Sequence, residues 1–146
     1  MQSQTITSWV IAGAVVLLGA TGCSQKKNAE CNALITMING GVQALEKTPK
    51  TEADPTGVSD LRGMAQAMDK VASDIGGVQL TIPEIRKFST DYQKMVKDIA
   101  KAERELAVAA EARDQPKRSA AEIALDAAVK PEDPLVDNIN KFCQTP

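Results

Sequence analysis

The feature that most constrains the fold is a run of apolar side chains that recurs every three or four residues over residues 85–109. This run predicts a long helix with one apolar stripe, and such a stripe has to be covered by neighbouring helices. Thr81 and Glu84 have the spacing of a capping box, and Pro83 suits the first turn. Pro116 ends the pattern, so we expect a helix of about 33 residues. The stripe consists of Ile85, Phe88, Tyr92, Met95, Ile99, Ala102, Leu106 and Ala109.

Two helices are expected before this one. The first covers residues 30–47, and Gly40 and Gly41 within it either allow a neighbouring helix to approach closely or mark a break. We favour the close approach. A polar loop over residues 48–56 separates the first helix from the second helix, which ends at Gly76 and Gly77 in a left-handed cap. The apolar stripes are Cys31, Leu34, Ile38, Val42 and Leu45 in the first helix, and Leu61, Met64, Met68, Val71 and Ile75 in the second.

Two shorter helices are expected after it. Ser119 and Glu122 form a second capping-box pattern, which opens an Ala-rich helix that stops near Lys130. Asp133 is expected to cap a last helix, which carries Leu135, Ile139 and Phe142 up to Cys143. We expect these two pieces to run in the same direction and to share one pass of a bundle.

The expected fold is therefore all-α, an up-down antiparallel helical bundle of about four passes. Aromatic residues make up only 3% of the chain, which suits helices packed through Leu, Ile, Val, Met and Ala better than it suits a sheet. An even number of passes brings the C-terminus back to the end where the first helix begins. A long helical hairpin with looser flanks is the alternative fold.

The N-terminal segment has the pattern of an export signal. Residues 9–20 are apolar without interruption, and this length suits the core of a signal peptide, whereas a membrane-spanning helix needs about 20 apolar residues. Ala20, Thr21, Gly22 and Cys23 follow, and they resemble the lipobox of bacterial lipoproteins. Ala20 stands where that family usually has Leu, and residues 1–8 lack the usual basic residue.

The resemblance implies that the chain is cleaved before Cys23, that the Cys23 thiol is lipidated, and that Ser24 directs the protein to the outer membrane. An ordinary secreted protein with a free thiol at Cys23 is the alternative. The resulting domains are a signal peptide over residues 1–22, a lipidated tether over 23–30 and a helical bundle over 31–146. The whole chain also loosely resembles small uncharacterised helical lipoproteins of Gram-negative bacteria that carry a cysteine near each end, a resemblance that implies no function.

Lipidation of Cys23 leaves Cys31 and Cys143 as the remaining cysteines of the chain. In an oxidising compartment two such thiols are expected to form a disulfide, and the bundle topology brings them to the same end. We therefore expect one disulfide that closes the bundle.

The sequence contains no signal for catalysis, for a cofactor or for a metal. It has no histidine, which excludes Cys-His nucleophiles and zinc sites with histidine ligands. Its 17 basic residues are interspersed among 19 acidic ones, so no basic stripe indicates nucleic-acid binding. Met64 and Met68 are expected to pack in the core rather than bind a soft metal. The acidic side chains are expected on solvated helix faces, among them Glu103, Glu111, Glu132 and Asp133.

Two functions fit this description. The first is a non-catalytic envelope lipoprotein, held at the membrane by its lipid, that presents a helical face to another envelope protein. The second is a carrier or sensor that binds a small apolar ligand between its helices. A cavity of several hundred cubic ångströms lined by Leu, Met and Ala would favour the carrier, and a filled core with an exposed apolar patch would favour the interaction module.

Overall fold

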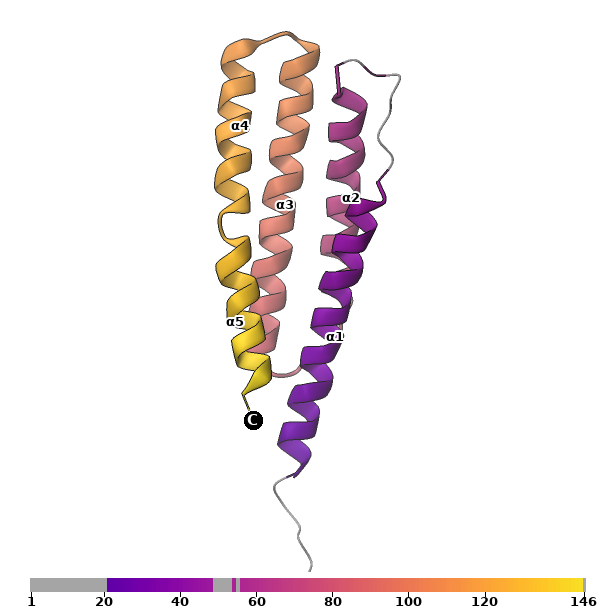
Figure 1. Ribbon diagram of the computed structural model, residues 1–146, viewed down its shortest axis with the longest axis vertical. Helices are drawn as coiled ribbons and strands as arrows, with labels where there is room; N and C mark the ends of the chain where they lie inside the picture. Colours follow the sequence, from indigo (N-terminus) through magenta and orange to yellow (C-terminus); the bar gives the residue numbers. More distant parts are fainter. Residues whose placement is uncertain (1–20, 49–53, 55, 146) are drawn as a thin grey trace, which may run out of the picture.

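The computed structural model describes residues 21–48, 54 and 56–145, and it confirms an all-α, up-down antiparallel bundle. Three long helices alternate in direction, and two shorter ones continue each other along a fourth pass, with α3 between α2 and α4 (Figure 1). Residues 1–20 of the predicted signal segment lie outside the described part of the chain. The side chain of Cys23, the predicted lipidation site, is not described either. The helices are α1 (Thr21–Glu46), α2 (Val58–Gly76), α3 (Pro83–Glu111), α4 (Gln115–Val129) and α5 (Glu132–Gln144).

The two ends of the bundle chain are joined covalently, as predicted. Cys31 of α1 and Cys143 of α5 form a disulfide with their Cα atoms 5.7 Å apart. Beside it, the rings of Phe88 and Phe142 meet edge to face at 5.7 Å between centroids. Lys27 places its ammonium group 4.5 Å from the Phe142 ring centroid and donates a hydrogen bond to the Thr145 carbonyl at 2.7 Å. α1, α3 and α5 are therefore fastened together at one end.

The core is built around α3, and the predicted apolar stripe of this helix is buried or half-buried along its whole length. Leu34 of α1, Ile75 of α2 and Ile85 of α3 are completely buried within it. Because α3 is covered by several helices, a second stripe on it is buried as well. That stripe consists of Ser89, Val96, Ala100, Glu103 and Ala107.

The start of α3 differs from the prediction, because Thr81 and Glu84 do not form a capping box. Ile82 is the N-cap residue and its side chain makes no capping hydrogen bond. The carboxylate of Glu30, on α1, takes that role from across the bundle. It accepts hydrogen bonds from the backbone N–H groups of Thr81 and Ile82, both at 2.9 Å, and from the Thr81 hydroxyl.

The turn between α3 and α4 also corrects the prediction. α3 ends at Glu111, short of Pro116, because Arg113 adopts a left-handed backbone conformation with φ of 53°. Asp114 then caps α4 by accepting a hydrogen bond from the backbone N–H of Lys117 at 3.1 Å. Pro116 consequently lies in the first turn of α4, a position that tolerates proline, and Ser119 lies inside the helix instead of capping it.

Three smaller boundaries differ from expectation. α1 begins at Thr21, so the residues expected to form a tether are helical in its first turns. Gly77 caps α2 in a right-handed conformation, with its N–H directed to the Ser73 and Asp74 carbonyls. α5 begins at Glu132 after Pro131, so Asp133 is not its cap.

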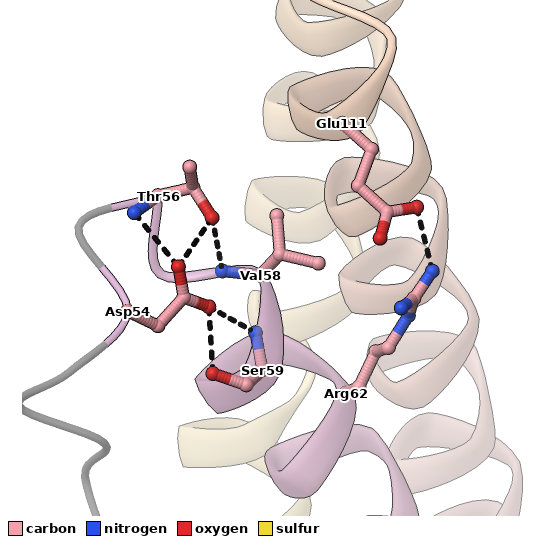
Figure 2. A network of polar contacts seen from close by, with 6 residues as sticks. All are labelled: Asp54, Thr56, Val58, Ser59, Arg62 and Glu111. Carbon is pink, nitrogen blue, oxygen red and sulfur yellow. Dashed lines mark hydrogen bonds and ion pairs between the residues drawn. The ribbon is translucent and has the colours of Figure 1, made fainter.

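The turn before α2 is organised by one carboxylate. Asp54 accepts hydrogen bonds from the backbone N–H groups of Thr56 at 2.9 Å and Ser59 at 2.8 Å, and from both hydroxyls (Figure 2). These bonds, led by those from Ser59, hold the pKa of Asp54 well below its usual value. Arg62 and Glu111 then form an ion pair of 2.6 Å that joins the start of α2 to the end of α3 (Figure 2).

No helix within the described residues has an apolar stretch long enough to cross a membrane.

Candidate binding cavity

A solvent-open cavity of about 460 Å³ lies between the helices, and every helix contributes to its wall. Three of the lining residues, Val42, Glu46 and Val129, are exposed. The volume of the cavity falls within the range of small-molecule sites, roughly 300 to 1,000 Å³. Most of the wall is aliphatic or thioether, so the cavity suits an apolar molecule. The lining residues are Val42, Leu45 and Glu46 from α1, Met64, Met68 and Val71 from α2, Tyr92, Met95, Val96, Ile99 and Glu103 from α3, Leu125 and Val129 from α4, and Glu132 from α5.

The architecture explains why space remains here. α1 ends partway along α2, whereas α2, α3 and α4 continue beyond it (Figure 1). Just before that end, Gly41 lets α1 approach α2 closely, since a Cβ atom there would lie 2.7 Å from a methyl carbon of Val71. The close approach expected at the glycine pair is therefore made by Gly41. Gly40 has no neighbouring atom within 4 Å of its Cβ position. The cavity opens just past this contact, where Val42 and Leu45 reach its wall.

Glu103 is the unusual member of the lining. Only 8% of its surface is exposed, and its Oε2 atom is buried without a hydrogen-bond partner among the described residues. Burial raises the pKa of this carboxyl to about 7, against a smaller lowering by the neighbouring Arg104. Arg104 itself forms an ion pair with Asp69 on α2. The expectation that Glu103 lies on a solvated helix face is therefore wrong.

Two other carboxylates reach the same cavity. Glu46 comes from the end of α1 and Glu132 from the start of α5. Tyr92 is 3% exposed, and its pKa is raised first by burial and then by the negative charge of Glu132. Among the described side chains that line the cavity, none is basic. The chamber thus combines an apolar wall with a negative electrostatic character.

The remaining candidates from the sequence are not brought together into a site. Met64 and Met68 are half-buried and line the cavity as apolar side chains. Glu111 is exposed in its ion pair with Arg62, far along α3 from Glu103, and Asp133 is exposed. Within the part of the chain that is described, no group of three or more Cys, Asp or Glu side chains is arranged to hold a metal ion.

The sequence did contain a signal for Glu103. Val96, Ala100, Glu103 and Ala107 are spaced four, three and four residues apart, which is the spacing of a helix face. This second face carries small residues, as expected where another helix packs closely. A glutamate on such a face is a candidate buried acid.

Comparisons of the chain with models of protein families, with curated protein sequences and with solved structures found no match.

Proposed function

We propose that this chain is a lipid-anchored protein of the bacterial cell envelope whose helical bundle binds a small, largely apolar molecule. The observation that carries the binding role is the cavity of about 460 Å³ between α1, α2, α3, α4 and α5. Its wall is mainly Leu, Val, Ile and Met, and the disulfide between Cys31 and Cys143 ties the flanking helices together. A tied frame around a preformed apolar cavity is suited to binding, because little order has to be created when the ligand enters.

The anchor in this proposal is Cys23, on the resemblance of residues 20–23 to a lipobox. The outer membrane is the proposed location, on the resemblance at Ser24. α1 begins at Thr21, so a helix connects the proposed anchor to the disulfide-bonded end of the bundle. In this arrangement the bundle stands close to the membrane surface.

The binding role can be tested in cell envelopes that contain the full chain. The probe is decanol carrying a diazirine at the far end of its alkyl chain, and the readout is the position of photolabelled peptides. We expect saturable labelling of the α2 and α4 peptides that contain Met64, Met68 and Leu125. Excess unmodified decanol should compete with the probe.

A pair of tryptophan substitutions on α4 supplies the control. Leu125→Trp fills part of the cavity and should abolish this labelling, whereas Ile123→Trp adds the same ring at a position that is 70% exposed. Labelling should therefore survive in Ile123→Trp. If labelling is confined to surface positions, or is the same in both variants, the bundle is not the proposed carrier.

A second candidate function, the presentation of a helical face to another envelope protein, is favoured by apolar side chains outside the core. Val108 on α3 is 57% exposed and Ile123 on α4 is 70% exposed. A hollow of about 370 Å³ between these helices is lined by Val108, Ala109, Ala120 and Ala121 among others. Site-specific crosslinking from position 120, an exposed residue of the same hollow, tests this function in intact cells. The function requires one discrete crosslinked product that Val108→Asp and Ile123→Asp both diminish.

A further inference from the structure

We infer that the ligand of the central cavity is an amphiphilic cation, an apolar body ending in a protonated amine whose ammonium group bonds to the Glu103 carboxylate. This inference rests on the proposed binding role and adds the chemical class of the ligand.

The first argument is the unsatisfied atom. Oε2 of Glu103 is buried and has no hydrogen-bond partner in the described structure. Buried polar atoms are normally paired, and Glu103 is a lining residue of the cavity, so its incompletely bonded carboxylate group points to a donor supplied from outside the chain. The adjacent Arg104 does not supply it, because its guanidinium group is engaged with Asp69 at the surface.

The second argument is the sign of the charges around the cavity. Glu46 from α1, Glu103 from α3 and Glu132 from α5 all line it. The contributions of α2 and α4 are apolar, and no described lining residue is basic. A carboxylate ligand such as a fatty acid would bring a fourth negative charge, which like-charge repulsion disfavours. An alcohol would satisfy one hydrogen bond but would leave the acidic charges uncompensated.

The third argument concerns the shape of the ligand. Glu103 belongs to a wall that is otherwise made largely of Leu, Met, Val and Ile. One buried acidic group in an apolar chamber fits a molecule with a single cationic head and an alkyl or ring body. A polyamine with charges spread along its length would also place charge against the apolar Met64 and Met68 side chains, which costs desolvation free energy.

Protonation of Glu103 supplies a distinctive signature. The pKa of this carboxyl is raised to about 7, and a protonated carboxyl cannot form an ion pair with an ammonium group. The charged group that acts on it is Arg104 on α3, and the other titratable residues of the cavity wall are Tyr92 on α3, Glu46 on α1 and Glu132 on α5. Amine binding should therefore weaken as the pH falls through about 7, and alcohol binding should not.

The test uses three diazirine probes of equal chain length, decylamine, decanol and decanoate, on cell envelopes containing the full chain. We expect decylamine to label the cavity peptides at a half-saturating concentration about ten-fold below that of decanol, with decanoate the weakest. Glu103→Gln should remove the advantage of the amine over decanol. Glu105→Gln, an exposed neighbour on α3 that does not line this cavity, is the matched control and should behave as the wild type.

Each outcome has a clear reading. Cavity labelling by decanol that equals or exceeds labelling by the amine overturns the cationic ligand and leaves the binding role intact. The same is true of an amine advantage that persists in Glu103→Gln or does not change with pH. Absence of cavity labelling by all three probes overturns both the ligand class and the proposed function.

Discussion

The Glu30 carboxylate on α1 accepts hydrogen bonds from the backbone N–H and the hydroxyl of Thr81, which lies 51 residues later in the chain. It also accepts one from the N–H of Ile82 and so caps α3. The carboxylate lies at the N-terminus of α3, where the helix dipole favours negative charge. One side chain thereby fixes the relative position of α1 and α3 at the end of the bundle that also carries the disulfide.

Replacing Glu30 with alanine should lower the melting temperature by several degrees, because it leaves the Thr81 and Ile82 N–H groups unpaired in a partly buried site. The Thr81 hydroxyl and the Ile82 N–H hold the pKa of Glu30 below its ordinary value of 4.5. A lowered pKa stabilises the fold above 4.5 and loses that effect as the pH falls below it. The difference between wild type and variant should therefore shrink in acid. Thermal melts at several pH values measure this difference, with Glu84→Ala as the control. An equal loss of stability in Glu84→Ala would show that Thr81 and Glu84 form the local capping box after all.

This contact shows what local sequence patterns leave out. Thr81 and Glu84 have the spacing of a capping box, but the partner of Thr81 comes from another helix, and no rule on neighbouring residues can find it. The bundle itself was predictable, because the apolar stripe from Ile85 to Ala109 constrains the topology and so, independently, do the two cysteines near the ends of the bundle segment. The first residue of α4 could not be predicted, because Asp114 and Ser119 are both good capping residues. Asp114 is the cap because the chain turns at Arg113, directly before it.

Glu103→Gln should stabilise the protein at alkaline pH. The pKa of Glu103 is raised from 4.5 to about 7, so the folded state holds its proton more tightly than the unfolded chain does. The contribution of this carboxyl to the free energy of unfolding is therefore largest below pH 4.5 and is lost as the pH rises toward 7, by at most about 3 kcal/mol. The variant lacks this dependence. Urea unfolding of wild type, Glu103→Gln and Glu105→Gln at pH 5 and pH 8 measures the difference, and a variant less stable than wild type at pH 8 would show that Glu103 is paired.

The burial of Glu103 escaped prediction for a reason that lies in the packing of α3. A helix at the side of a bundle buries one stripe, and the strong stripe through Ile99 was assigned that role. α3 lies between α2 and α4 and buries a second stripe, on which Glu103 stands (Figure 1). The number of neighbours around a helix depends on the assembly of all the passes, so the width of its buried face is not a local property of its sequence.

Reduction of the disulfide should lower stability strongly while leaving the helices formed at low temperature. Cys31 and Cys143 are 112 residues apart, and a loop of that size corresponds to about 5 kcal/mol in the chain-entropy model. Cys31 belongs to the same buried core as Leu34, Ile75 and Ile85, but burial of those three apolar side chains does not depend on the S–S bond. Far-UV circular dichroism and thermal melts of the wild type and of a Cys31→Ser, Cys143→Ser variant test this. A melting temperature that does not change would show that the chain ends are held by Phe142, Lys27 and their neighbours alone.

Cys23 carries the prediction about location. If residues 20–23 act as a lipobox, the mature protein begins at Cys23 with acyl chains on its thiol and amino group, and it should fractionate with membranes. Each buried CH₂ contributes about 0.8 kcal/mol, so one acyl chain binds a membrane only marginally, whereas two or three hold the protein firmly. Cys23→Ser should move the protein from the detergent phase to the soluble envelope fraction, or leave it uncleaved with its apolar segment attached. Ser24→Asp should by the same resemblance move it from the outer to the inner membrane, which density-gradient separation resolves. Intact mass decides the point: a species starting at Cys23 with added acyl mass supports lipidation, and an unmodified thiol at that position rules it out.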